Sequence, residues 1–312
     1  MQDEIDIDFG SINPSQDVTP VMGTSRPTID VSNAKNSTDI LDAVLNAKKE
    51  EVMPWEDCIL PSRGIYYSWN TDRVRVKPLT QTAEKILATQ RLAESGQSID
   101  YLFREFVEFP DGFKSEDLLA GDRMFILFYL RGITYGNMYE FTVTCPNPEC
   151  LDVNGNRTKF PYQYDLNRLA ATIKQPNPRI GLEPFKVVLP YLSSIVNTEF
   201  YVHVRFLRGY DQIQTKKLRK SDKRSQFNDL FTESITKCIV SVMGSDDPFK
   251  ISQFVETKLH DRDFATIREF ISDNTPSMDP TAVIECPKCG TEFNIELPIT
   301  ESFFRSAATG RV

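Results

Sequence analysis

Alternating apolar and polar residues predict two short strands, each placed after a Leu-Pro pair. Leu60-Pro61 precedes the alternating segment 73–79, and Leu189-Pro190 precedes the alternating segment 201–207. A period of two residues is typical of a strand with one buried face. In each half of the chain a valine of the strand follows the leucine, by 14 residues in the first half and by 13 in the second. The same element therefore recurs at nearly the same distance.

Further along each half, a segment with helical periodicity begins at an acidic residue. Asp122 and Asp263 each stand 23 residues before a cysteine, which is Cys145 in the first half and Cys286 in the second. Between aspartate and cysteine, apolar residues recur at i, i+3 and i+4: Ile126, Tyr129 and Leu130, then Ile267, Phe270 and Ile271. This spacing predicts an amphipathic helix, and the acidic residue favours its N-terminus.

The matched spacings predict an internal duplication of one α+β unit. We expect the first repeat to span residues 56–168 and the second to span 184–306, joined by a proline-containing linker over 169–183. Each repeat consists of a strand, a helical region and a hairpin that carries a pair of cysteines. Helical segments outnumber strands, which favours an α+β fold with paired cysteine-knuckle hairpins.

Segments of different character flank the repeats. Residues 1–35 are poor in aromatics and rich in Asp, Ser, Thr, Pro and Asn, which predicts a flexible acidic arm. The lead-in over 36–55 contains a short amphipathic helix, predicted over 37–51. Its apolar stripe has i, i+1, i+4, i+5 spacing: Ile40, Leu41, Val44 and Leu45. Residues 307–312 form a tail.

Four of the six cysteines form two pairs that can bind one metal ion. The sequence Cys286-Pro-Lys-Cys289-Gly290 has the pattern of a zinc knuckle at a hairpin tip, where glycine permits a positive φ. A structural zinc site needs four ligands, and Cys145 and Cys150 hold the equivalent place in the first repeat. We therefore expect Cys145, Cys150, Cys286 and Cys289 to share one structural zinc ion per chain.

The first pair departs from the knuckle pattern, and alternatives stay open. Four residues separate Cys145 from Cys150, Pro146 and Pro148 remove amide donors, and Leu151 replaces the glycine. The alternatives to a shared zinc are reduced thiols without metal, and a disulfide within a pair, which a reducing cytoplasm disfavours. A catalytic zinc needs an open coordination position, and no His, Asp or Glu replaces a cysteine to provide one.

The remaining candidate residues are expected to have structural roles and do not form a catalytic site. Cys58 and Cys238 are isolated, and both are expected to be buried. His203 alternates with valines on a predicted strand, where an exposed or hydrogen-bonded histidine is expected. The sequence has no phosphate-binding glycine loop, no Gly-x-Ser-x-Gly and no His-Glu-x-x-His. The chain is therefore predicted not to be an enzyme.

Composition and charge limit the classes of protein to which the chain can belong. The chain is 40% hydrophobic and 26% charged, with a net charge of −8, which disfavours coating of nucleic acid. Its longest apolar run, Met124 to Leu130, has seven residues, whereas a membrane span needs about 20. This run predicts a core helix or a helix partly buried by another subunit. Phe303-Phe304 either closes the core or docks into a partner. No secretion signal is recognised at residue 1, so an intracellular protein is expected.

Residues 205–224 form a basic segment with only two acidic residues, Asp211 and Asp222. The basic residues are Arg205, Arg208, Lys216, Lys217, Arg219, Lys220, Lys223 and Arg224. The simplest interpretation is that these residues form the solvated face of a helix. The acidic arm over 1–35 is one candidate to bind this face. The functional alternative is a zinc-ribbon protein that binds nucleic acid through this segment.

Several short motifs resemble a known family. Leu60-Pro-Ser-Arg-Gly-Ile-Tyr-Tyr67 is similar to its opening Leu-Pro-Ser-x-Gly-x-x-Tyr, and 76–80 is similar to its strand-to-helix junction. Gly121-Asp-Arg123, Tyr135-Gly136 and 141–146 then follow in the family's order. The family is the baseplate hub assembly chaperone of T-even-type contractile-tailed phages, related to small baseplate hub subunits. The resemblance covers about residues 56–306, with the widened first cysteine pair as its clearest departure.

The resemblance implies a non-enzymatic structural or assembly role in a phage tail baseplate. It implies partners among other baseplate or hub proteins. Composition and charge add the expectation that the chain binds neither membrane nor nucleic acid, and self-association is a further expected contact. The protein would be made in the host cytoplasm and would act in the tail baseplate of the virion.

Overall fold

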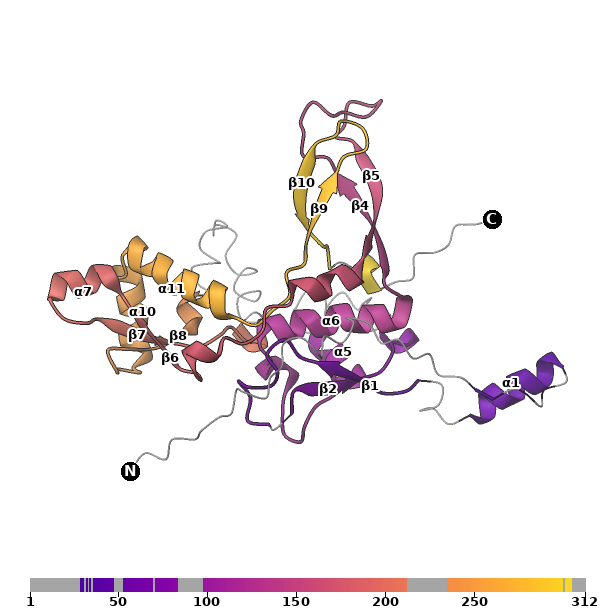
Figure 1. Ribbon diagram of the computed structural model, residues 1–312, viewed down its shortest axis with the longest axis horizontal. Coiled ribbons are helices and arrows are strands. Elements are labelled where there is room, and N and C mark those ends of the chain that lie inside the picture. Colours follow the sequence, from indigo (N-terminus) through magenta and orange to yellow (C-terminus); the bar gives the residue numbers. More distant parts are fainter. Residues whose placement is uncertain are drawn as a thin grey trace.

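The computed structural model describes residues 29–30, 32, 34, 36–47, 53–69, 71–83, 98–211, 235–299 and 301–304. These residues form helices and small antiparallel sheets, which confirms the α+β class. Figure 1 shows two bodies along the long axis and two hairpins that project together from one of them. The predicted acidic arm lies almost wholly outside the described residues, and the tail over 307–312 lies entirely outside them. None of the helices in the described part is long and apolar enough to cross a bilayer.

The first unit contains a three-stranded sheet, two long helices and a hairpin. Its elements are β1 (Glu56–Ile59), β2 (Arg73–Val76), α5 (Ser98–Phe106), β3 (Val107–Glu108), η2 (Ser115–Asp117), α6 (Ala120–Tyr135), β4 (Met138–Thr144) and β5 (Lys159–Asp165). Helix α1 (Ser37–Asn46) precedes it. Helix α1 is shorter than the predicted helix over 37–51, and residues 48–52 lie outside the described residues.

The second unit has a partly different element order, because α7 lies between its first two strands whereas β1 leads to β2 through turns. Short 3-10 helices connect the units, η3 (Leu166–Thr172) and η4 (Pro178–Ile180). The unit's elements are β6 (Phe185–Val188), α7 (Pro190–Val196), β7 (Tyr201–Val204), β8 (Ile239–Val242), α10 (Pro248–Thr257), α11 (Asp261–Asn274), β9 (Thr281–Glu285), β10 (Glu292–Glu296) and η5 (Glu301–Phe304). The duplication itself stays a prediction.

Two three-stranded antiparallel sheets have matching strand orders, β1-β2-β3 and β6-β7-β8. The predicted strands over 73–79 and 201–207 are shorter than expected. Strand β2 ends at Val76, two residues before Pro78, which cannot donate to a ladder. Strand β7 ends at Val204 because the backbone N–H of Phe206 donates to Glu183 Oε1 (2.6 Å) and leaves the strand pairing.

Helix α6 is the centre of the first core, as its apolar run predicts. Every residue from Gly121 to Gly132 except Met124 is buried. The Phe128 ring packs edge-on against Phe303, and both side chains are fully buried. The C-terminal pair Phe303-Phe304 therefore closes the first core, which decides between the two alternatives that the sequence left.

A buried aspartate at the start of each long helix holds the Leu-Pro turn of its unit. Asp122 in α6 accepts the backbone N–H of Ser62 (3.0 Å), and Asp263 in α11 accepts that of Tyr191 (2.8 Å). Both carboxyl groups are fully buried. Because a buried amide left unpaired is costly, these bonds fix each turn against its helix.

The two units meet where the segment 205–211 runs beside the N-terminus of α6. Gly209 donates its N–H to Leu118 O (2.9 Å), and Ala120 donates its N–H to Leu207 O (2.8 Å). A Cβ at Gly121 would lie 2.2 Å from Pro276 O, so glycine permits the helix to approach the loop after α11. The units are thus joined by backbone contacts as well as by the chain.

Candidate metal centre

Both cysteine pairs lie at the ends of the projecting hairpins, which stand side by side in Figure 1. Strand β4 pairs with β5 from Met138↔Asp165 to Thr144↔Lys159, and Cys145 follows directly. Strand β9 pairs with β10 up to Glu285↔Glu292, and Cys286 follows in the same way. Alternate residues of β4 and β9 are buried, which directs one face of each hairpin towards the other.

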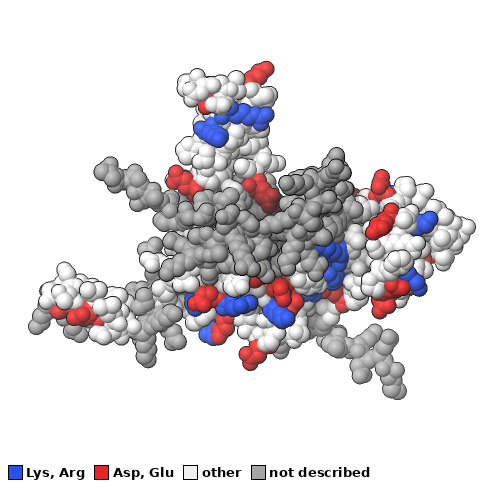
Figure 2. Space-filling view, turned by 180° about the vertical axis from the view of Figure 1, so that it is seen from behind, with Lys and Arg blue, Asp and Glu red and all other residues white. Residues whose placement is uncertain are grey.

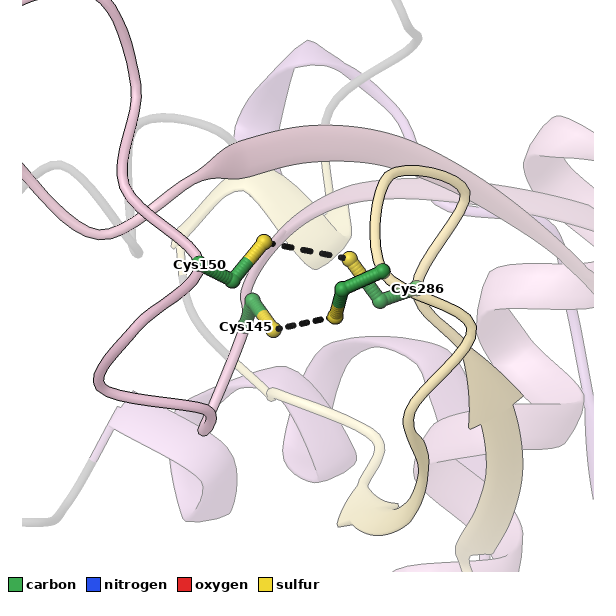
Figure 3. Close-up of side chains that lie close together, drawn as sticks. Cys145, Cys150 and Cys286 are labelled. Carbon is green, nitrogen blue, oxygen red and sulfur yellow. Dashed lines mark hydrogen bonds between the residues drawn. The ribbon is translucent and has the colours of Figure 1, made fainter.

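The four sulfurs form one cluster, as predicted from the sequence (Figure 3). Sγ of Cys145 lies 3.7 Å from Sγ of Cys289, and Sγ of Cys150 lies 3.9 Å from Sγ of Cys286. All four atoms lie within 4.8 Å of one another. A tetrahedral zinc ion with Zn–S bonds of about 2.3 Å would separate its sulfurs by about 3.8 Å. The donor set therefore fits one tetrahedral ion. All four cysteines are free thiols.

The second-repeat turn has the geometry of a knuckle. Cys286 donates its backbone N–H to Thr291 O (3.0 Å), and Gly290 donates its N–H to Cys286 O (2.9 Å). Gly290 has a φ of +70°, which confirms the predicted reason for glycine at this position. The turn brings Cys289 back beside Cys286.

The first-repeat turn reaches the same cluster by a longer path. Cys145 donates its backbone N–H to Thr158 O (2.9 Å), and Cys150 donates its N–H to Asn147 O (3.1 Å). Asn147 stands between the two prolines and keeps its own N–H, which is directed at the sulfur of Cys145. The widened pair therefore retains one backbone N–H donor to sulfur, although Pro146 and Pro148 have none.

The sulfurs differ in electrostatic environment. Burial raises the pKa of the Cys145 thiol well above its usual value. Hydrogen bonds with the Thr291 hydroxyl and backbone N–H lower the pKa of Cys289. Cys145, Cys150 and Cys286 are buried, whereas Cys289 is exposed. A divalent ion would stabilise all four groups as thiolates, because a coordinating thiol loses its proton.

Two threonines beside the cluster were not assigned a role from the sequence. Thr158 Oγ1 lies 3.4 Å from Sγ of Cys150, and Thr291 Oγ1 lies 3.2 Å from Sγ of Cys289. Each hydroxyl can donate to a thiolate and so orient it. The signal was present, since Thr158-Lys-Phe and Thr291-Glu-Phe follow the two cysteine pairs.

The other cysteines and the histidines lie away from the cluster. Cys58 and Cys238 are buried, as predicted, and burial raises the pKa of Cys238 to about 12. His203 Nδ1 lies 2.9 Å from Ser241 Oγ, which confirms a hydrogen-bonded strand histidine. His260 caps α11 by accepting the N–H of Arg262.

Only the start of the predicted basic segment falls within the described residues. Arg205 binds both carboxylate oxygens of Asp211, at 2.8 and 2.9 Å. Arg208 binds Glu183 (2.5 Å) and the carbonyl oxygen of Asp117 (2.9 Å). Arg208 therefore stabilises the junction between the units, and Arg205 stabilises the turn over 205–211, which corrects their interpretation as part of a solvated helix face. The other six basic residues lie outside the described part.

The structure is an α+β fold in which two hairpins bring four cysteine sulfurs together. The model of one family, described as T4 bacteriophage base plate protein, matches residues 47–305, and the chain belongs to this family. No curated protein and no solved structure gives a significant match. The resemblance found in the sequence is thereby confirmed at the level of a phage baseplate protein.

Proposed function

We propose that this chain is a non-enzymatic structural or assembly component of the hub region of a phage tail baseplate, acting through protein–protein contacts. The family match supports the baseplate assignment. The observation that carries the proposal is the four-cysteine cluster, which joins residues 144 and 136 positions apart in sequence. With an ion bound, such a cluster would hold the two hairpins in one orientation, as a binding scaffold requires.

One zinc ion per chain is proposed at this cluster, held by Cys145, Cys150, Cys286 and Cys289. Four thiolates fill a tetrahedral shell, so the ion would have a structural role and no position for a reacting water. Its bonds would connect the hairpin of one predicted repeat to that of the other.

Surface charge supports protein partners over nucleic acid. In the view of Figure 2, basic and acidic side chains are interspersed over the described residues. Arg205 and Arg208, the first two cations of the basic segment, already bind carboxylates of this chain. A phosphate-binding surface would instead present cations free to replace counterions.

Affinity capture tests the proposal. The tagged full chain, expressed during infection, should recover tail and hub proteins, and it should elute from duplex DNA below ~0.15 M salt. Mass spectrometry of purified particles beside infected-cell lysate then separates a retained component from an assembly factor that leaves. Tight DNA binding with no tail protein recovered would overturn the proposal.

A further inference from the structure

Cys289 is the accessible member of the four-cysteine cluster. Its side chain is exposed, whereas the other five cysteines of the chain are buried. Thiol–disulfide exchange requires access to the sulfur, so a reagent in solution reaches Cys289 first. An accessible cysteine that lies beside a second thiol is typical of a redox-sensitive site. The cluster is therefore open to oxidation at one residue.

The sulfur that contacts Cys289 belongs to the other hairpin. Sγ of Cys145 lies 3.7 Å from Sγ of Cys289, whereas the contact on its own turn is the Thr291 hydroxyl at 3.2 Å. Cys150, also on the first hairpin, lies within hydrogen-bond reach of the same sulfur. A disulfide bond is about 2 Å long, so the sulfurs of Cys145 and Cys289 need to approach by less than about 2 Å to form one.

The remaining two sulfurs of the cluster also contact each other across the hairpins. Sγ of Cys150 lies 3.9 Å from Sγ of Cys286, and both side chains are buried. Cys150 has a further contact with the Thr158 hydroxyl at 3.4 Å. Both sulfur–sulfur contacts therefore connect one hairpin with the other.

We propose that a small disulfide oxidises Cys289 and Cys145 to a disulfide bond that joins the two hairpins. This pairing differs from a disulfide within either cysteine pair, which is the alternative that the sequence alone favours. The bond connects residues 144 positions apart, so it keeps the hairpins together without a metal ion.

The reaction takes place in two exchange steps. The Cys289 thiolate attacks one sulfur of the small disulfide, whose S–S bond breaks, and a mixed disulfide forms as one small thiolate leaves. The Cys145 thiolate then attacks the Cys289 sulfur, the mixed disulfide breaks, and the second small thiolate leaves. The two protein thiols lose two electrons, the small disulfide gains them, and the two thiol protons pass to the leaving groups.

Oxidation removes two of the four ligands of the cluster. Cys150 and Cys286 alone cannot complete a tetrahedral shell, so a bound zinc ion is released into solution. This release rests on the proposed zinc site, whereas the disulfide itself does not. A reducing cytoplasm favours the thiols, and an oxidising medium outside the cell favours the bond. The hairpins are thus joined in both environments.

Fragment mapping of the full chain tests the pairing. The purified chain is treated with oxidised glutathione, alkylated, denatured and cleaved after its methionines, which separates residues 139–243 from 279–312. These two fragments should stay linked without a reductant and separate after reduction. Mass spectrometry should identify one Cys145–Cys289 bond per chain, compared with none before treatment.

Single substitutions test the order of the two steps. Cys289→Ser should prevent the bond, because the other cluster thiols are buried. Cys145→Ser should retain glutathione on Cys289 as a mixed disulfide. Cys238→Ala is the matched control, since Cys238 lies in the fragment 139–243 and is buried away from the cluster. This control should form the same link as the unmodified chain.

The outcomes separate this inference from the zinc proposal. A Cys286–Cys289 bond in the unmodified chain, four free cluster thiols after treatment, or oxidation of Cys289→Ser at the unmodified rate would overturn the inference. Zinc is measured in the same samples and should fall from one ion per chain to none. A Cys145–Cys289 bond in a chain that never held zinc supports the disulfide and contradicts only the zinc site.

Discussion

The two units make the same buried contacts with different chemical groups. Asp122 accepts hydrogen bonds from the backbone and hydroxyl of Ser62 and from the Tyr67 hydroxyl. Asp263 accepts two backbone amides, those of Tyr191 and Leu192. The cysteine turns differ in a similar way, with four intervening residues in one and two in the other. The location of each contact is thus set by the strand and helix framework, and the local residues that make it vary.

Removing either half of the cysteine cluster should have the largest effect. Cys145→Ser with Cys150→Ser and Cys286→Ser with Cys289→Ser should each reduce zinc from one ion per chain to none, because two thiolates cannot complete the site. With free zinc about 1,000-fold above Kd, the lost binding would lower stability by about 4 kcal/mol.

Elemental analysis and thermal melting measure these losses, and Cys238→Ala should keep its full zinc content as a buried non-ligand control. If one pair of serines left zinc in place, the hairpins would not share the ion. A folded unmodified protein that contains no zinc would show that the cysteine cluster is not a zinc site.

The pH dependence of stability should reveal the burial of Asp122. Burial outweighs the hydrogen bonds at Asp122 and raises its pKa from 3.8 to about 6. The folded state therefore keeps a proton that the unfolded state loses, so this contribution is full below about pH 4 and declines up to about pH 6. Since one pKa unit corresponds to about 1.4 kcal/mol, the decline is about 3 kcal/mol.

Chemical denaturation between pH 4 and pH 7 measures this slope. Asp122→Asn should flatten it. An identical slope in the Asp122 variant would show that another group carries the dependence.

Replacing Asp263 should show how much its hydrogen bonds with two backbone N–H groups contribute to stability. Asp263→Ala leaves the N–H groups of Tyr191 and Leu192 without their acceptor and should cost about 2 kcal/mol. Asp261→Ala, at an exposed position in the same helical turn, should cost much less. Equal losses in denaturant unfolding would mean that α11 needs only the acidic charge near its N-terminus.

The smallest expected effect comes from substitutions at matched positions of the two cysteine turns. Gly290→Ala places a Cβ at a φ of +70° and should cost about 1 kcal/mol, with weaker retention of zinc against a chelator. Leu151→Ala, at the matched position of the widened turn, should change stability by less than about 0.5 kcal/mol. A larger effect at Leu151 would reverse the assignment of the second turn as the constrained one.

Sequence patterns predicted the features that depend on local spacing. The i, i+3, i+4 apolar residues located α6 and α11, and the knuckle beside Cys286 indicated a hairpin tip. The distance of 23 residues between aspartate and cysteine in both halves suggested that Cys145 and Cys286 meet. These predictions succeeded because helix periodicity and hairpin turns leave a direct record in neighbouring residues.

Ion pairs between residues far apart in the sequence leave no such pattern. Arg205 and Arg208 looked like members of a basic surface, yet their partners include Glu183, more than 20 residues earlier. The same carboxylate ends the strand at Val204 by accepting the N–H of Phe206. Charge counting along the chain cannot show which cations are neutralised by residues that the fold brings near.

The packing of residues 297–304 in the first core imposes an order on folding. Leu297, Phe303 and Phe304 are buried in the same cluster as Phe128 and Tyr139. A ribosome adds about 5–20 residues per second, so both units and both hairpins are translated before these side chains exist. The first unit therefore keeps part of its apolar surface open until residues 297–304 have been made. Its maturation is a late event, even though its residues are made first.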